Sequence, residues 1–548
     1  MSSFVLVLHG HLPWVVHHGR WPHGEEWLHE AVAETWLPLL EALDEVHARG
    51  AVAPITIGLT PVLLEQLRHP RFQDSFPGWL DARIERATRD EDEFAGWGDQ
   101  HLARVARHWQ ARLTAVRQRF EGLDGDLCGA FARLWNEGRI EVMGSAATHA
   151  YLPLLKEDRS VQRQIEGGLE VSERILGRRP EGFWLPECAY RPGGTWRAHV
   201  LDDAPVQRRG LDELLADAGV RWTVVDAHLV RGSRSEGVLE AGRFSKVGWD
   251  QARSDEGRMW RSPLEPHRVS SLGSERGVDL LTRHPQVSEQ VWSSKVGYPG
   301  DGRYLEFHKR HGDAGLRYWR VSSVRAGLEA KERYDVDQIP GTVYSHAQHF
   351  CAVVRGALQE HAASGREGVL VAPFDAELFG HWWHEGPAFL LDVLLTLGAD
   401  DEVHVDTATE ALSRVGVDKV VGLPPGSWGE GGDDRVWTDT GQDWMWEVAH
   451  RAEQRLAELQ GLSDLKGRAA EVLALAEREL LLLQASDWWF AISRGSAVDY
   501  ASKRFAWHAG AFDRLCDLAW DLQCGEEPTS AQLALLTACS EMDQPPRA

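Results

Sequence analysis

The sequence predicts an α/β protein built on parallel strands, with seven strand candidates that fit a β/α barrel. Short apolar runs alternate with helical stretches over roughly the first 400 residues, a pattern typical of parallel strands joined by crossover helices. Most of the runs end at a polar or charged residue, and a β/α barrel carries its active site at the carboxyl ends of its strands. No G-x-G-x-x-G motif follows a strand, so nothing indicates a dinucleotide-binding sheet.

The strands and helices follow in order along the chain. The expected strands are Phe4–His9, Pro54–Gly58, Ile140–Gly144, Gly182–Pro186, Trp222–Asp226, Gly341–Ser345 and Val369–Asp375. Apolar residues at helical spacing predict helices between them, for example Glu30–Arg49 and Ser160–Leu176. Residues 62–135 are helical and charged and are expected to form an insertion after the second strand. Residues 231–300 are polar and glycine-rich and are expected to form an irregular loop region, which is often functional.

The last part of the chain has a helical pattern. Helices are expected at Trp444–Gln460, Ser463–Gln484 and Ala501–Leu522. We therefore expect a barrel domain over residues 1–410 and a separate helical domain over residues 411–548.

Composition restricts the partners. The formal net charge of -24 argues against nucleic acid or an anionic membrane as the main partner. No apolar run approaches the ~20 residues of a membrane span. The cysteines form no C-x-x-C pair, and the N-terminus resembles a first strand rather than a leader. These features predict reduced thiols in a cytoplasmic protein.

Two of the expected strands lead directly into a carboxylate. The run Val369–Asp375 ends in an acid, and Phe183-Trp-Leu-Pro leads into Glu187. Each acid lies near Trp or Tyr, whose apolar faces suit a sugar ring, so the pair suggests acid/base chemistry on a sugar. The alternative is that each acid caps a helix or pairs with Arg. A retaining glycosidase places its two carboxyl groups about 5–5.5 Å apart and an inverting one places them further apart.

Histidines and tryptophans accompany these acids. His9 and His11 form an H-x-H pair after the first strand, and His149 follows the third. They fit a metal site, hydrogen bonds to sugar hydroxyls, or satisfied polar positions of the barrel floor. We favour sugar contacts because no third and fourth metal ligand occurs at typical spacing. The tryptophans beside acids, His or Gly are Trp14, Trp21, Trp184, Trp292, Trp382, Trp383, Trp428, Trp437, Trp488 and Trp489.

Two segments near the C-terminal part add candidates. Ser486-Asp-Trp-Trp-Phe490 is expected to lie in a helical core, although Asp487 could reach across to the barrel. The glycine-rich stretch Gly426–Gly432 displays Trp428 on a loop, which favours contact with a ligand.

Five blocks of the chain, taken in order, resemble glycoside hydrolase family 57, and within it the 1,4-α-glucan (glycogen) branching enzymes. The blocks are His9-Gly-His-Leu-Pro13, Gly58-Leu-Thr-Pro61, Trp184-Leu-Pro-Glu-Cys-Ala-Tyr190, Ala372-Pro-Phe-Asp-Ala-Glu-Leu-Phe-Gly-His381 and Ala485-Ser-Asp-Trp488. The sequence around His149, Trp292, Asp301 and Trp428 also resembles that of the branching enzymes. Any single block is weak evidence, whereas five in order are strong.

The resemblance implies a distorted (β/α)7 TIM-like barrel with a helical insertion and a C-terminal all-helical domain. It also implies a retaining mechanism without metal or other cofactor, with Glu187 as nucleophile and Asp375 as acid/base. The expected reaction cleaves an α-1,4 link of amylose or glycogen and forms an α-1,6 branch. The expected substrate-binding residues are His9, His11, Trp21, His149, Trp292, Asp301, His381, Trp428, Trp437, Asp487 and Trp488. The α-glucan is the expected partner, with no nucleic acid or membrane, for a monomer or small homo-oligomer.

One departure from the family leaves alternatives open. In the branching enzymes a mobile loop carries a Tyr that shields the intermediate from water, whereas no Tyr occurs here between Tyr190 and Tyr298. Trp249 and Trp260 are the candidates to replace it. The alternative function is therefore an α-glucan hydrolase or 4-α-glucanotransferase of the same family. A zinc-dependent carbohydrate hydrolase or deacetylase and a non-catalytic glycogen-binding protein are two further alternatives.

Overall fold

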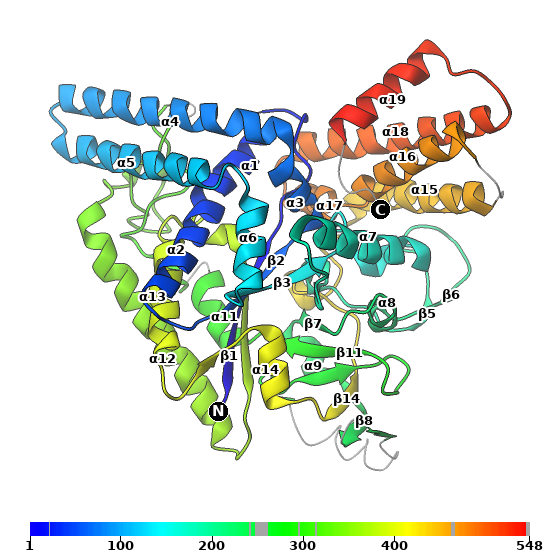
Figure 1. Cartoon of the computed structure of the whole chain (residues 1–548), viewed down its shortest axis with the longest axis horizontal. Coiled ribbons are helices and arrows are strands. Elements are labelled where there is room, and N and C mark those ends of the chain that lie inside the picture. Colours follow the sequence, from blue (N-terminus) through cyan, green and yellow to red (C-terminus); the bar gives the residue numbers. More distant parts are fainter. Residues whose placement is uncertain are drawn as a thin grey trace.

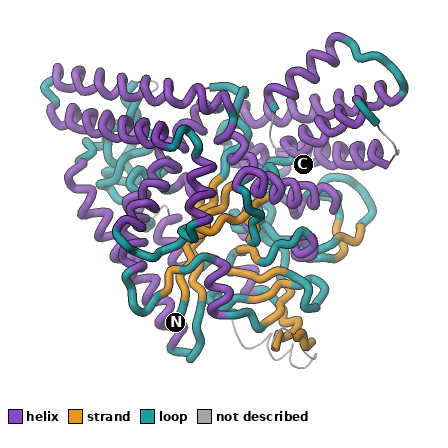
Figure 2. Tube along the Cα trace, viewed as in Figure 1, coloured by secondary structure: helices purple, strands orange, loops and turns teal. Residues whose placement is uncertain are grey.

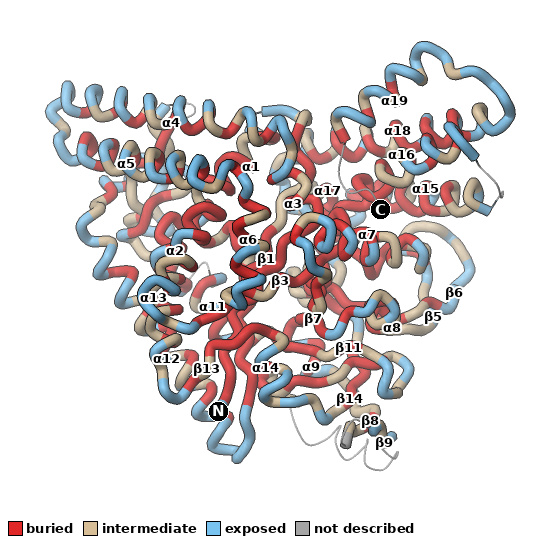
Figure 3. The backbone as a smooth tube through the Cα atoms, in the orientation of Figure 1, coloured by how far each residue is buried: buried red, intermediate tan, exposed pale blue. Residues whose placement is uncertain are grey.

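The computed structural model describes residues 1–20, 22–240, 243–246, 261–293, 296–312, 315–461 and 466–543. Its strands gather in the centre and lower part of the view in Figure 1, with a helical hairpin at the upper left and a group of C-terminal helices at the upper right. Figure 2 shows that helices make up most of the periphery. In Figure 3 the central strands are almost wholly buried, whereas exposed residues concentrate on the outer faces of the helices.

Seven described strands form a closed parallel barrel. In order around the barrel they are β1 (Ser3–Gly10), β2 (Ile55–Leu59), β3 (Ile140–Ser145), β4 (Gly182–Trp184), β7 (Trp222–Val225), β11 (Val278–Thr282) and β12 (Val369–Asp375). β12 pairs in parallel with β1 along its whole length. On the other side, a parallel bridge joins Arg283 to Val371, and the backbone N–H of His284 donates to the Val371 carbonyl at 2.9 Å. The predicted seven-stranded barrel is therefore confirmed.

The prediction of one strand was wrong. Gly341–Ser345 lies inside helix α12 (Ile339–Ala362), not in the sheet. Pro340 suits the first turn of a helix, and the buried side chains of Val343, Ala347 and Val354 recur at helical spacing. A five-residue window was too short to reveal that period.

The strand that replaces it is β11, which lies in the expected irregular region 231–300. The described part of this region also contains β8 (Arg234–Glu240), β9 (Arg243–Lys246), β10 (His267–Val269) and helix α11 (Pro285–Trp292). β10 pairs with β11 and with β14 (Lys419–Gly422), so these strands extend the sheet beyond the barrel. In the described part of this region, short strands and a helix account for the low periodicity of the sequence.

Helices surround the barrel and form the insertion. Those after the barrel strands include α1 (Glu25–Ala31), α2 (Leu37–Ala48), α7 (Asp158–Leu176), α8 (Leu211–Asp217), α9 (Ala227–Arg231), α13 (Gly386–Gly398) and α14 (Ala408–Val415), with the π-helix η1 (Val32–Trp36) between α1 and α2. The insertion comprises α3 (Pro61–Arg68), α4 (Pro70–Gly96), α5 (Gln100–Gly122) and α6 (Leu127–Asn136), in agreement with the prediction for residues 62–135.

The C-terminal helices pack against the β3–β4 side of the barrel. They are α15 (Asp443–Gly461), α16 (Arg468–Leu483), α17 (Asp487–Ser493), α18 (Val498–Gln523) and α19 (Ser530–Met542). Trp446 and Trp489 stack at 4.4 Å within their core, and this core also includes Phe183 and Leu185 at the end of β4. None of the described helices has both the length and the apolar character required to cross a membrane.

A buried charged network ties these helices to the segment that follows β1. Asp543 accepts a hydrogen bond from His18 Nε2 at 2.6 Å and from Trp507 Nε1 at 2.9 Å. His508 Nδ1 bonds Glu479 at 2.7 Å in the same network. All of these carboxylates are buried, so each one depends on its partners.

Substitution Asp543→Ala is expected to lower the free energy of unfolding by about 3–5 kcal/mol, because it leaves buried polar partners without their carboxylate. Urea denaturation followed by tryptophan fluorescence measures the change. Asp513→Ala is the control, since Asp513 pairs with Arg455 on the surface and an exposed pair contributes about 0–1 kcal/mol. Equal effects of the two substitutions would contradict the assigned role of the buried network.

Candidate active site

A cavity of about 760 Å³ opens at the carboxyl ends of the barrel strands. Residues at or just after the ends of four strands line it: His9 from β1, Glu187 from β4, Arg283 from β11 and Asp375 from β12. The loop 426–432, helices α1, α17 and α18, and residues Phe307 and Arg310 supply further parts of the wall. The two carboxylates identified from the sequence, separated by 188 residues along the chain, therefore meet in one cavity.

Backbone geometry holds Glu187 in place. Glu187 and Cys188 both have left-handed backbone conformations, with φ of 62° and 49°. Consecutive non-glycine residues in this region are strained and persist only where the surroundings hold them. The Glu187 carbonyl accepts the Trp428 backbone N–H at 3.0 Å, and Tyr190 and Gly426 exchange two backbone hydrogen bonds of 2.8 and 3.0 Å. In this backbone conformation the Glu187 side chain lines the cavity.

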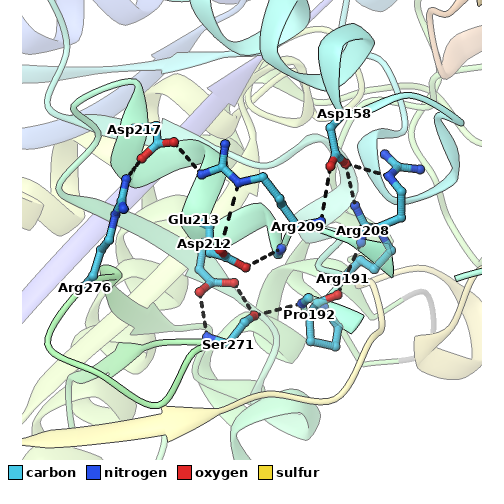
Figure 4. Close-up of polar contacts among 12 residues, drawn as sticks. Asp158, Arg191, Pro192, Arg208, Arg209, Asp212, Glu213, Asp217, Ser271 and Arg276 are labelled. Atoms are coloured by element: carbon cyan, nitrogen blue, oxygen red, sulfur yellow. Dashed lines mark hydrogen bonds and ion pairs between the residues drawn. The ribbon is translucent and has the colours of Figure 1, made fainter. Parts of the chain in front are cut away.

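Side-chain contacts anchor the segment that follows Glu187. The Tyr190 hydroxyl donates to Asp212 at 2.8 Å, and Asp212 in turn accepts from the Ser271 backbone N–H at 2.7 Å. Figure 4 shows this carboxylate with Ser271, next to the pairing of Arg208 with Asp158 at 2.6 Å. These contacts fix the chain only a few residues beyond Glu187.

The two carboxylates have different surroundings. Burial raises the pKa of both Glu187 and Asp375 to about 7, and the charge of Glu187 adds to the rise at Asp375. Trp428 Nε1 donates to Glu187 Oε2 at 2.9 Å, which stabilises the ionised form of Glu187. Within the described residues no donor reaches Asp375. The N–H donor favours ionisation of Glu187, and the charge of Glu187 then favours the neutral form of Asp375.

The capping and ion-pair alternatives do not fit these acids. Asp375 precedes the 3-10 turn η7 (Ala376–Leu378), but its side chain caps no backbone N–H. Among the described ion pairs, none includes Glu187 or Asp375. Both carboxyl groups are thus available to a ligand in the cavity.

His9 and His149 form a neutral pair beside the carboxylates. Their Nε2 atoms lie 3.0 Å apart, and His149 Nδ1 bonds Ser486 Oγ at 3.0 Å. The His9 ring stacks on Trp184 at 4.6 Å. Burial, with the neighbouring histidines, lowers the pKa of both rings well below the ordinary value. The His9–His149 contact then consists of one hydrogen bond between neutral rings.

His11 connects the barrel to the C-terminal helices. Its Nδ1 lies 3.1 Å from Thr60 Oγ1, and its Nε2 lies 3.0 Å from both carboxylate oxygens of Asp487 on α17. Its backbone N–H donates to Glu377 at 3.2 Å. Asp487 thus reaches across to the barrel, and the cavity needs both parts of the chain.

Indoles cover much of the cavity wall. Trp428 contacts Trp184 at 5.0 Å and Trp292 at 5.8 Å, both edge to face. Trp437 and Trp488 also line the cavity although they are almost fully buried. Trp437 stacks on Tyr151 at 4.2 Å, and Trp488 donates to the Leu482 carbonyl at 2.8 Å.

Several candidates from the sequence are not brought to the cavity. Asp301 pairs with Arg303 at 2.6 Å and is not among the lining residues. Trp14 and Trp489 are buried in the core. Trp21 lies outside the described residues, as do Trp249 and Trp260.

One residue that supports the site, Glu34, was missed from the sequence. The predicted His381 lines the cavity, and its Nδ1 bonds Glu34 at 2.9 Å. Although burial opposes it, Arg317 and His381 lower the pKa of Glu34 to about 2. Glu34 lies in the π-helix η1, a form often found at functional sites. Its sequence gave no signal, since a helix interior commonly carries Glu.

Among the described residues, His9 and His11 do not belong to any group whose ligand atoms lie close enough together to share a metal ion. Within the described ranges, two groups have the spacing of metal ligands, Asp90–Glu93–His311 and Glu479–His508–Asp543. Neither group includes a residue that lines the cavity.

Two family models match the chain. The model of glycosyl hydrolase family 57 covers residues 5–424, and that of the 1,4-alpha-glucan branching enzyme C-terminal region covers residues 448–545. The 1,4-alpha-glucan branching enzyme TK1436 of Thermococcus kodakarensis is 36% identical over 549 residues, which cover 98% of this chain and 76% of that protein.

Two solved structures share the fold along most of their length. The GH57-type branching enzyme from Pyrococcus horikoshii matches with a TM-score of 0.88 and 34% identity, over 99% of this chain and 94% of that one. The α-amylase AmyC from Thermotoga maritima matches with a TM-score of 0.80 and 27% identity, over 98% and 97% of the two chains. On the extent of these matches, the chain belongs to glycosyl hydrolase family 57.

Proposed function

We propose that this chain is a 1,4-α-glucan branching enzyme that works by a retaining mechanism. The observation that carries the proposal is the pair of buried carboxyl groups, Glu187 and Asp375, in one indole-lined cavity, where Glu187 alone accepts from an N–H donor of the described residues. The branching enzymes of Thermococcus kodakarensis and Pyrococcus horikoshii, similar over nearly the whole chain, support the choice of reaction.

In the first step, the Glu187 carboxylate attacks the anomeric carbon of an α-1,4-linked residue. The bond between that carbon and the glycosidic oxygen breaks, and Asp375 donates its proton to the departing oxygen. The products are a glycosyl ester on Glu187 and a shortened glucan with a free 4-hydroxyl. The neutral form of Asp375 is favoured at the start because burial and the charge of Glu187 both raise its pKa.

In the second step, a 6-hydroxyl of another glucan chain attacks the same carbon. The ester bond to Glu187 breaks, and the Asp375 carboxylate takes the proton of the attacking hydroxyl. An α-1,6 branch results, and both carboxyl groups return to their initial states. Water in place of the hydroxyl gives hydrolysis, so exclusion of water decides the outcome.

The remaining lining residues are proposed to bind the glucan. Trp292, Trp428, Trp437 and Trp488 offer apolar faces to sugar rings, while His381 and Asp487 offer hydrogen bonds to hydroxyls. Both ring nitrogens of His11 and of His149 have protein partners, so these two histidines and His9 are proposed to bind a hydroxyl in exchange for a bond to a neighbouring side chain.

The location, assembly and domain limits of the protein are also proposals. The described cysteines have free thiols, which supports a cytoplasmic enzyme. We propose a monomer or small homo-oligomer, with a catalytic barrel over residues 1–410 and a helical domain over residues 411–548.

A second candidate function is an α-glucan hydrolase or 4-α-glucanotransferase of the same family. The absence of Tyr between Tyr190 and Tyr298 favours it, because the family's shielding residue is missing. The likeness to the α-amylase AmyC also fits hydrolysis.

Incubation with amylose followed by enzymatic debranching tests the proposed function. Branching gives a new distribution of short chains that is released only on debranching. Product chains that are unchanged by debranching would instead establish a hydrolase or 4-α-glucanotransferase.

Substitutions Glu187→Gln and Asp375→Asn keep side-chain size and remove the acid. Each is expected to lower kcat by at least about a thousandfold, while the Kd for maltoheptaose, measured by calorimetry, stays within about threefold of the wild type. Full turnover in either variant would reject the covalent mechanism, and a wild type that binds without turnover on any glucan would indicate a binding protein.

Substitution Trp428→Phe is expected to shift the acid limb of the pH–rate profile to higher pH by about one unit. The indole N–H stabilises the Glu187 carboxylate, so its loss raises the Glu187 pKa and protonates the nucleophile at a higher pH. Trp292→Phe is the matched control, because its N–H points to the Pro373 carbonyl. An unchanged acid limb in Trp428→Phe would show that another group limits the rate at low pH.

A further inference from the structure

An exposed indole lies on the loop that follows Asp375. Trp382 is 53% exposed yet lines the catalytic cavity. Its ring packs on Phe307 with centroids 4.6 Å apart and planes inclined by 33°. An exposed indole at the border of a cavity offers its apolar face to a ligand there. Its neighbour Trp383, by contrast, is only 2% exposed and belongs to the core.

The backbone fixes Trp382 close to the acid/base. The Trp382 N–H donates to the Glu377 carbonyl at 3.1 Å, two residues beyond Asp375. Gly380 has a φ of 121°, and a Cβ there would lie 1.9 Å from the Glu34 carbonyl oxygen. This close approach allows only glycine, so the loop is held firmly against η1.

Polar groups flank the indole on the cavity side. The His381 backbone N–H donates to Thr35 Oγ1 at 3.2 Å, and its ring Nδ1 bonds Glu34. Nε2 is then the ring nitrogen left for a ligand. Arg310, also a lining residue, pairs with Glu30 at 3.0 Å. An apolar plate with fixed polar groups at its edge matches the apolar face and hydroxyl rim of a glucose unit.

We propose that the Trp382–Phe307 platform, with His381, binds the acceptor: the second α-glucan chain, which receives the transferred segment. This inference rests on the proposed retaining transfer. By microscopic reversibility, the group that protonates the leaving oxygen also deprotonates the incoming hydroxyl. The acceptor oxygen therefore lies on the Asp375 side of the sugar, and Trp382 belongs to the loop of Asp375.

A glycosyl fluoride donor isolates the acceptor step. Maltoheptaosyl fluoride forms the Glu187 ester with loss of fluoride, so no sugar occupies the leaving-group side. Fluoride release then measures ester formation, while free maltoheptaose and longer products measure its partition between water and an added maltooligosaccharide. Trp382→Ala is expected to raise the acceptor concentration for half-maximal transfer at least tenfold and to increase hydrolysis, and Trp382→Phe is expected to lie between it and the wild type.

The matched control is Trp97→Ala. Trp97 is 62% exposed and packs on Phe94, but it lies outside the cavity lining, so its loss should leave the partition as in the wild type. Unchanged transfer in Trp382→Ala, or a rise in the donor KM for fluoride release with an unchanged partition, would overturn the acceptor site.

Linkage analysis of the products separates this inference from the proposed function. If the wild type transfers only to 4-hydroxyls and Trp382→Ala weakens that transfer, branching is rejected and the acceptor site stands. A wild type that hydrolyses without transfer at any acceptor concentration would overturn both.

Discussion

The rest of the site depends on two carboxyl groups that share one cavity and are so deeply buried that ionisation of both is unfavourable. Burial raises the pKa of each, and among the residues that the structure describes one N–H donor, on Trp428, reaches Glu187 and none reaches Asp375. Without that donor, the order of ionisation would rest on small differences in solvation. The proposed mechanism therefore depends on the loop 426–432, because the Trp428 backbone N–H binds the Glu187 carbonyl and the Trp428 indole stabilises the ionised Glu187 side chain.

Strain in the backbone is the second constraint. Glu187, Cys188 and His149 all have positive φ values and follow the ends of β4 and β3, and Glu187 and His149 line the cavity. Such conformations cost of order 1–3 kcal/mol each and require compensation nearby. Here the compensation comes from distant parts of the chain: Gly426 and Trp428 hold the Glu187 turn, and Ser486 bonds His149.

The sequence was informative where a local pattern coincides with the tertiary role. Strand β12 and its terminal Asp375 were predictable because a continuous apolar run ends in an acid, and the barrel class followed from the alternation of elements. Strand β11 was not predictable, since five residues between polar segments are too few to show a periodic pattern. The strand prediction for Gly341–Ser345 was wrong because five residues of a long helix were read on their own. Glu34 and the bond from Ser486 to His149 were not predicted, because these roles arise from contacts with residues more than 300 positions away.

The same contacts explain why a barrel alone cannot form this site. His11 is held between Thr60 of the barrel and Asp487 of α17, and His149 bonds Ser486 just before that helix. Removal of the C-terminal helices would take away the partners of two cavity histidines and the indole wall of Trp488. The buried network around Asp543 links α16 and α18 to the segment after β1, and α17, which carries Asp487, packs on α18. The Asp543 network and the contacts that hold His11 and His149 therefore belong to the same interface, between the C-terminal helices and the barrel.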